Sequence, residues 1–135
     1  MKIEKNIITT DKAPAAVGPY SQATATGNLV FTAGQIPLDP ANGKLVTGDI
    51  EEQTHRVLQN VQALLQEARS SLATVIKTTV FMTDLADFSR MNAVYSEYFP
   101  SEPPARSTVQ VTALPLGAQI EIECVAMTNL VTKSS

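Results

Sequence analysis

Apolar residues change their spacing repeatedly along this chain, and these changes limit the folds open to it. Near the N-terminus they alternate with polar residues, as in strands, whereas over residues 50–68 they recur every three or four positions, as in a helix. Strand-like spacing returns over residues 75–83, helical spacing over 87–99, and two strand-like segments follow. This order predicts an α+β domain, with a mixed β-sheet and two helices packed on one face.

Local signals place the ends of several elements. Gly27 and Asn28 supply a tight turn between two strands, and prolines, glycines and asparagine mark a loop over residues 35–48. Asp49 is the expected N-cap of the first helix, with Glu52 completing a capping-box pattern. The strands are expected at residues 1–10, 20–26, 29–33, 75–83, 106–112 and 119–130.

The composition indicates one domain over residues 1–135 that shares part of its surface with other subunits. A chain of this length is an ordinary single domain. Charged residues make up 17% of it, against about 25% in a typical soluble domain. The net charge of −3 gives no electrostatic case for binding a nucleic acid backbone.

Cysteine and histidine each occur once, at Cys124 and His55. An intrachain disulfide needs two cysteines and a zinc cluster needs several such ligands, so neither is expected. Cys124 is expected to be a small buried side chain and His55 a solvated one on the first helix. No metal or other cofactor is expected. The N-terminus has no apolar signal segment, and no apolar run is long enough to span a bilayer, so a cytoplasmic protein is expected, with an organelle left open.

Charged side chains stand within the last two apolar strands. Arg106 heads one of them, while Glu121 and Glu123 alternate with Ile120 and Ile122 in the other. Within each strand the charged positions lie on the face opposite the apolar ones. An arginine fork can bind a carboxylate at two points, and a carboxylate in apolar surroundings can hold or activate a water. Spacing alone leaves a second interpretation open, in which these are surface ion pairs.

Several motifs resemble one known family. Residues 104–109 (PARSTV) and 117–126 (GAQIEIECVA) closely resemble the signature of the Rid family, the reactive intermediate deaminases, also called the YjgF family. The resemblance continues through residues 13–23, 32–37, 75–82 and 92–95, in order, and covers nearly the whole chain.

This resemblance implies an enzyme that hydrolyses reactive 2-imino and enamine acids, such as 2-iminopropanoate and 2-iminobutanoate, to 2-keto acids and ammonia. Such imines leak from pyridoxal-phosphate-dependent serine and threonine dehydratases, which are the implied functional partners. The family is similar in fold to the trimeric chorismate mutase of Bacillus. Its members are homotrimers with sites in the clefts between subunits.

The resemblance also assigns roles to residues of this chain. It implies that Arg106 binds the substrate carboxylate, framed by backbone groups of Gly34 and Thr108, and that Glu121 positions the attacking water. Tyr20 and Asn92 match positions that line the cleft. At position 33 many imine-active members carry serine where this chain has alanine.

Two other classes of function stay open at this point. One is a non-catalytic module that binds 2-keto acids in the same cleft, which the missing hydroxyl at Ala33 keeps open. The other is an RNA-directed translation inhibitor, against which the net charge and the lone histidine argue.

Overall fold

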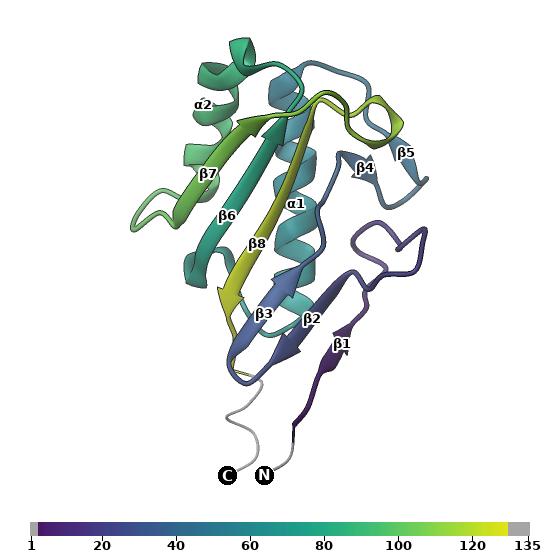
Figure 1. Ribbon diagram of the computed structural model, residues 1–135, viewed down its shortest axis with the longest axis vertical. Coiled ribbons are helices and arrows are strands. Elements are labelled where there is room, and N and C mark those ends of the chain that lie inside the picture. Colours follow the sequence, from purple (N-terminus) through teal and green to yellow (C-terminus); the bar gives the residue numbers. More distant parts are fainter. Residues whose placement is uncertain (1–2, 130–135) are drawn as a thin grey trace.

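The computed structural model describes residues 3–129 as a six-stranded sheet with two helices packed on it (Figure 1). The helices are α1 (Ile50–Glu67) and α2 (Phe88–Tyr98). The strands are β1 (Asn6–Ile8), β2 (Ala23–Thr26), β3 (Leu29–Thr32), β4 (Leu38–Asp39), β5 (Lys44–Leu45), β6 (Val75–Met82), β7 (Ala105–Gln110) and β8 (Ile120–Met127). Single 3-10 turns occur at Leu72–Thr74, Leu85–Asp87 and Pro115–Gly117.

The sheet is mixed, with strand order β1-β2-β3-β8-β6-β7. Every neighbouring pair is antiparallel except β6 and β7, which run parallel because α2 carries the chain back between them. The two C-terminal strands are therefore not partners: β6 lies between β7 and β8. The last strand of the chain thus becomes a central strand, which places Glu121 in the interior of the sheet.

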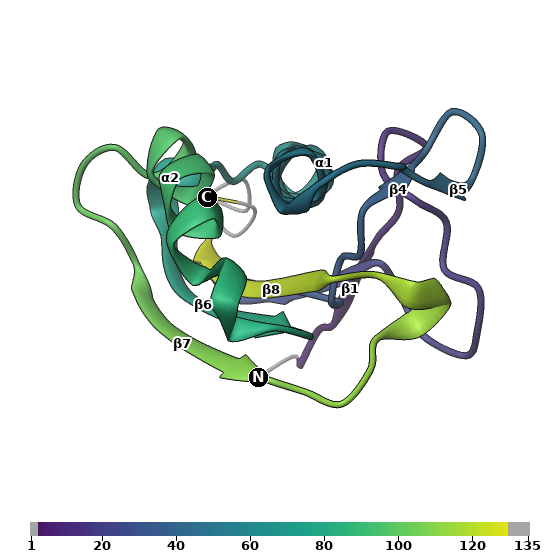
Figure 2. The same cartoon turned by 90° about the horizontal axis from the view of Figure 1, so that it is seen from above.

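Both helices cover the same face of the sheet, as Figure 2 shows from above. Their apolar stripes bury the alternating face of β8, whose Ile120, Ile122, Cys124 and Ala126 are at most 3% exposed. Helix α1 contributes Val57, Leu58, Val61 and Leu65 to this core, all essentially inaccessible. The predicted α+β class with two helices on one face is confirmed.

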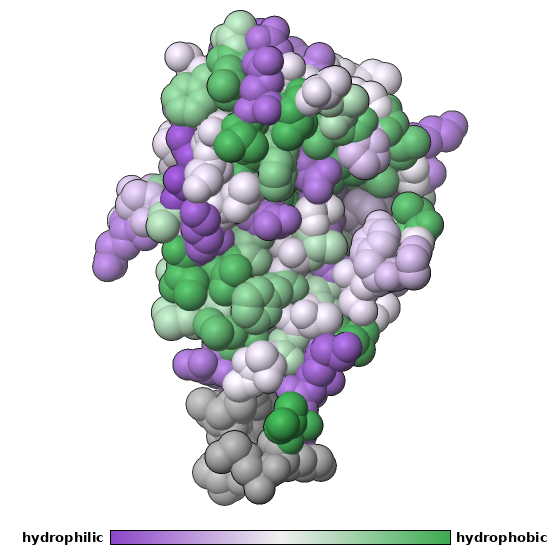
Figure 3. Space-filling view, in the orientation of Figure 1, coloured by the Kyte–Doolittle hydropathy of each residue, from purple (hydrophilic) through white to green (hydrophobic). Residues whose placement is uncertain are grey.

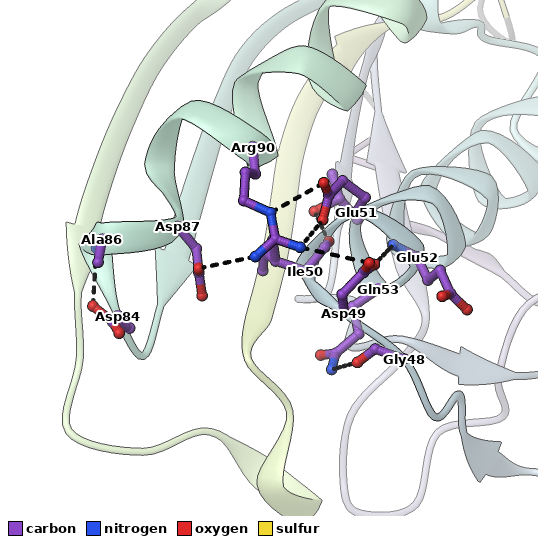
Figure 4. Close-up of polar contacts among 11 residues, drawn as sticks. Gly48, Asp49, Ile50, Glu51, Glu52, Gln53, Asp84, Ala86, Asp87 and Arg90 are labelled. Atoms are coloured by element: carbon purple, nitrogen blue, oxygen red, sulfur yellow. Dashed lines mark hydrogen bonds and ion pairs between the residues drawn. The ribbon is translucent and has the colours of Figure 1, made fainter.

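The two helices begin where the sequence predicted. The Asp49 carboxylate accepts a hydrogen bond from the backbone N–H of Glu52 at 3.0 Å, which satisfies a free donor of the first turn of α1. Arg90 of α2 reaches Glu51 at 2.6 Å, Asp49 at 3.5 Å and Asp87 at 3.7 Å, and so links the first turns of both helices (Figure 4). Exposed ion pairs add little stability, so this cluster mainly orients the two helix ends.

The N-terminal half departs from the predicted boundaries. The strand expected over residues 1–10 is only the three residues of β1 within the described part of the chain. The loop expected over 35–48 contains the small hairpin of β4 and β5. The turn at Gly27 is confirmed, with φ of 56°, a left-handed backbone that glycine adopts without penalty.

The face of the sheet that carries no helix is partly apolar. Ile7, Phe31, Val109 and Met127 project from it, and Phe31 and Val109 are each 42% exposed. Figure 3 shows this open face, where apolar side chains gather among polar ones. A half-exposed apolar sheet face of this kind is typical of a surface that another protein subunit covers.

Candidate functional site

Glu121 lies against a glycine. Its carboxylate occupies the place where residue 34 would otherwise carry a side chain: a Cβ on Gly34 would overlap Oε2 of Glu121 and lie 2.7 Å from its carboxyl carbon. Paired backbone bonds between Gln35 and Ile122, at 2.9 and 3.1 Å, hold the two segments together. With a glycine at position 34, the Glu121 carboxylate can occupy this position, and a Cβ there would displace it.

The Glu121 carboxyl is also electrostatically unusual. Partial burial raises its pKa above the ordinary range for glutamate, and the neighbouring Glu123 carboxylate raises it further. A carboxylate with a raised pKa is a stronger base toward a bound water than an ordinary surface glutamate. No positively charged side chain among the described residues is a cause of this pKa shift, so none of them lowers the pKa of Glu121 again.

Beside Glu121 lies a cavity of about 580 Å³, the Glu121 cavity. Three loops enclose it: residues 14–22, residues 33–43, and the turn before β8. Its lining residues are Pro14, Ala15, Val17, Tyr20, Gln22, Ala33, Gly34, Gln35, Ile36, Leu38, Gly43, Pro115, Leu116 and Glu121. The predicted residues Tyr20, Gly34 and Glu121 thus meet in one place, together with Ala33.

Buried amide side chains fix these loops, and sequence analysis did not single them out. Gln22 donates to the carbonyls of Thr10 and Pro14 at 2.9 and 2.8 Å. Asn60 of α1 donates to the carbonyls of Ile36 and Leu38 at 3.3 and 2.9 Å. Asn60 could have been identified from the sequence, because it lies within the apolar stripe of α1, between Val57 and Val61.

Arg106 lies on β7, an edge strand of the sheet, and contacts two aromatic side chains. Its guanidinium carbon lies 4.7 Å from the ring centre of Tyr95 and 5.5 Å from that of Phe88, both on α2. Tyr95 is itself anchored, because its hydroxyl bonds that of Thr78 on β6 at 2.7 Å. The rings of Tyr95 and Phe88 thus orient the Arg106 side chain.

A second cavity, of about 490 Å³, opens beside Arg106 and is called here the Arg106 cavity. Asn92, Tyr95, Ser96, Phe99, Pro103, Pro104 and Arg106 line it. The side-chain oxygen of Asn92 is buried and has no hydrogen-bond partner among the residues the structure describes. Such an acceptor is costly unless a donor arrives from outside, so it points to a ligand or a neighbouring chain.

The two cavities belong to opposite faces of the sheet. On β6, Thr78 pairs with Arg106 of β7, and Phe81 pairs with Glu121 of β8. Positions 78 and 81 differ by an odd number and so project from opposite faces. Arg106 lies on the helix-covered face, against α2, and Glu121 on the open face. Within one chain the two groups therefore line different cavities.

This placement refines the predicted polarity of the strands. Alternation within each strand was right, because Ile120 and Ile122 are buried while Glu121 is not. Arg106 also lies on the face of its strand opposite Val109, as expected. In β7, however, the apolar face with Val109 is the open face of the sheet, so Arg106 points toward the helices. Thr108 shares the face of Arg106 but is not among the residues lining either cavity.

The remaining titratable candidates lie outside both cavities. His55 is half-buried between the helices rather than solvated, and its Nδ1 is 2.9 Å from the hydroxyl of Tyr98. Cys124 is buried as predicted, and burial raises the pKa of its thiol to about 12. Within residues 3–129, no group of three or more His, Cys, Asp or Glu side chains could hold a metal ion. No helix in that range is long and apolar enough to cross a membrane.

Comparison with known proteins matches this architecture to one family. The sequence model of the family described as "Endoribonuclease L-PSP" matches residues 10–128. A RutC family protein of Pyrococcus abyssi is 54% identical, over 90% of this chain and 96% of its own length. Reactive Intermediate Deaminase A, chloroplastic, of Arabidopsis thaliana is 50% identical over 92% of this chain and 66% of that protein.

Two further similarities come from human and bacterial proteins. The human protein named 2-iminobutanoate/2-iminopropanoate deaminase is 43% identical over 97% of this chain and 96% of its own length. The structure of Escherichia coli TdcF with bound serine superposes with a TM-score of 0.87 at 43% identity, and covers 90% of this chain and 98% of TdcF. The chain therefore belongs to the endoribonuclease L-PSP family, the YjgF or Rid proteins that its motifs resemble.

Proposed function

We propose that this protein hydrolyses 2-imino acids to 2-keto acids and ammonia, in sites that join the Arg106 cavity of one subunit to the Glu121 cavity of another. The observation that carries the proposal is the separation of a carboxylate-binding cation and a water-binding carboxylate onto opposite faces of one sheet. Deaminases named among the relatives support the reaction class.

The Arg106 half of the site would hold the substrate's acid group. A guanidinium can bind a carboxylate through two parallel, charge-assisted hydrogen bonds, each worth about 1.5–3 kcal/mol. The rings of Tyr95 and Phe88 limit the positions of the fork, so little side-chain freedom is lost on binding. The free acceptor of Asn92, which lines the same cavity, suits an N–H donor such as the iminium group.

The Glu121 half would supply the water. The carboxylate accepts a hydrogen bond from a water and takes one of its protons as the oxygen attacks the imine carbon. The Glu121 carboxylic acid returns this proton to the amino nitrogen of the resulting carbinolamine, ammonia leaves, and the carboxylate takes the hydroxyl proton as the carbon becomes the carbonyl of the keto acid. Transfer of that proton to the departing ammonia, which leaves as ammonium, restores the Glu121 carboxylate. A protonated imine is already electrophilic, so placing water and substrate together removes a large part of the barrier.

The other predicted residues fit supporting roles in this scheme. Backbone groups of Gly34, next to the carboxylate of Glu121, and of Thr108, on the Arg106 strand, would frame the acid. The Tyr20 hydroxyl accepts from the backbone N–H of Val17 at 3.3 Å and so holds the loop that closes the Glu121 cavity. Ala33 offers only a methyl group to this cavity.

We propose a homotrimer as the assembly that completes the site. Each chain would offer its Arg106 cavity to one neighbour and its Glu121 cavity to the other, which closes a ring in cyclic symmetry. The half-exposed apolar side chains of the open face, such as Phe31 and Val109, are the surface available for burial (Figure 3). Their burial would also account for the low fraction of charged residues.

The substrates would include 2-iminopropanoate and 2-iminobutanoate, released by pyridoxal-phosphate-dependent dehydratases. A coupled assay tests this directly. A dehydratase generates the imine from serine or threonine, and the rate of keto-acid release is followed with and without this protein. We expect faster release with the protein and, for Arg106→Ala, the rate of the assay without it. Full activity of a folded Arg106→Ala protein would exclude the proposal.

A second candidate is a binding module for 2-keto acids that does not accelerate hydrolysis. The absence of a hydroxyl at Ala33 favours it, since proton handling at that position is lost. Calorimetric binding of a keto acid with no change in the rate of imine decay would select this alternative.

A further inference from the structure

We propose that Leu116 determines which substrates enter the site, by selecting 2-imino acids with a larger aliphatic side chain. This inference rests on the proposed imine hydrolysis and concerns its substrate class. Leu116 lines the Glu121 cavity, and its side chain is unusually open to solvent, with 72% of its surface exposed.

The backbone of Leu116 is strained. Its φ of 59° and ψ of 18° lie in the left-handed region, which is unfavourable for a residue with a Cβ relative to the right-handed region. Glycine would fit this conformation without that cost. Because this leucine is exposed, burial in the core does not offset its unfavourable backbone conformation. A role of the side chain in the cavity would explain why leucine is found here.

The loop that carries Leu116 is held in place. Pro115 precedes it, and the backbone N–H of Ala118 returns to the carbonyl of Pro115 at 3.1 Å. Ala118 is 1% exposed, and the N–H of Gln119 is bound at 3.0 Å by the side chain of Gln53 on α1. The position of Leu116 relative to Glu121 is therefore set by the fold, as a selecting residue requires.

The wall around Leu116 is apolar. Val17, Ile36, Leu38 and Pro115 line the same cavity, and Glu121 is the charged residue in its lining. The amides that also line it are engaged with the chain itself: Gln22 binds the carbonyls of Thr10 and Pro14, and Gln35 donates to the carbonyl of Ala33 at 3.2 Å. The space beyond the carboxylate thus offers apolar contact and few free polar groups.

This chemistry fits a substrate with several side-chain carbons better than one with a single methyl. Each additional methylene in an apolar pocket is worth about 10- to 200-fold in selection, whereas a methyl group would leave most of a cavity of about 580 Å³ unfilled. We therefore expect the imine derived from leucine to be hydrolysed with a kcat/KM at least about tenfold above that of the imine derived from alanine.

The test compares Leu116→Gly with Arg69→Gly. Both substitutions relieve a left-handed backbone, since Arg69 has φ of 59° as well, but Arg69 lies at the end of α1 and does not line the Glu121 cavity. Imines are generated from leucine and from alanine by an amino-acid oxidase in the presence of catalase, and keto-acid formation is followed. Leu116→Gly is expected to lower the leucine-to-alanine ratio of kcat/KM about tenfold or more, and Arg69→Gly to leave that ratio as in the wild type.

Two outcomes separate the failure of this inference from failure of the proposed function. Equal losses for both imines in Leu116→Gly, or a wild-type ratio near one, would overturn the selecting role while hydrolysis stands. If the wild type accelerates neither imine, calorimetry with 4-methyl-2-oxopentanoate and pyruvate decides. Tighter wild-type binding of the larger acid, lost in Leu116→Gly, supports the selecting role; equal affinities refute it.

Discussion

At the scale of single residues, the contact between Gly34 and Glu121 carries most of the functional argument. A missing Cβ lets a carboxylate lie against the backbone, and burial then raises the pKa of that carboxyl. The close approach of Glu121 to the backbone at Gly34 and the raised pKa of Glu121 are thus two results of the same packing arrangement.

Gly34→Ala is expected to lower kcat/KM by about a hundredfold while the protein still folds, because the new methyl displaces the Glu121 carboxylate by an ångström or more. The measurement is the imine-hydrolysis rate together with the circular dichroism spectrum. Gly18→Ala is the control, since its Cβ would meet the Tyr20 ring at an ordinary distance of 3.5 Å. Similar losses in both variants would contradict the steric explanation.

Glu121→Gln is expected to stabilise the fold at neutral pH while abolishing hydrolysis. The folded state raises the pKa of this carboxyl, so ionisation opposes folding. Stability from the protonated group is fully present below the unfolded pKa and is lost as pH rises through the folded one. Melting temperatures of the two proteins should therefore agree in acid and diverge toward neutral pH, with the glutamine variant higher. A constant difference at every pH would refute this assignment.

At the scale of elements, α1 acts as a frame for loops as well as a core helix. Gln53 holds the start of β8, and Asn60 holds the segment that follows Gly34. The helix itself was predictable, because its apolar spacing and its Asp49 cap are local signals. Its contacts with the loops were not, since which backbone groups meet a buried amide depends on tertiary packing.

Replacing Asn60 by leucine tests this framing role. The carbonyls of Ile36 and Leu38 would lose their donor, which costs about 1–3 kcal/mol for buried groups. We expect a lower melting temperature at fixed protein concentration. Asn42→Ala in the exposed β4–β5 turn is the control, expected to change the melting temperature less. Equal melting temperatures for Asn60→Leu and the wild type would show that the loop needs no such support.

The strand order shows the same limit of sequence-based prediction. Each strand of the six-stranded sheet and its alternation could be inferred from local patterns, as for Ile120 and Ile122. The insertion of β8 between β3 and β6 could not, and neither could the turning of Val109 onto the open face. Arg106 and Glu121 were therefore found as candidates, while their separation by the sheet became visible only in the structure.

At the scale of the whole molecule, the two halves of the proposed site lie on opposite faces of the sheet, so the proposed activity depends on assembly. Arg106 and Glu121 leave one chain from opposite faces, so the proposed trimer requires every site to draw on two chains. Mixing experiments can test this directly.

Arg106→Ala and Glu121→Gln proteins are expected to be inactive alone and to regain activity when unfolded together and reassembled in equal amounts. Random assembly would leave about one quarter of the sites with both functional groups intact. Hydrolysis near a quarter of the wild-type rate is the expected result. No recovery, in mixtures shown by native mass spectrometry to contain both chains, would place each site within one chain.

The division of the site between faces has a genetic consequence. A damaging allele at Arg106 or at Glu121 would spoil a single site of a mixed trimer that contains one altered chain, and the other sites would keep working. An allele that damages both halves would spoil two sites in the same trimer. The dominance of an allele in a cell with two gene copies should therefore depend on whether it harms one face of the sheet or both.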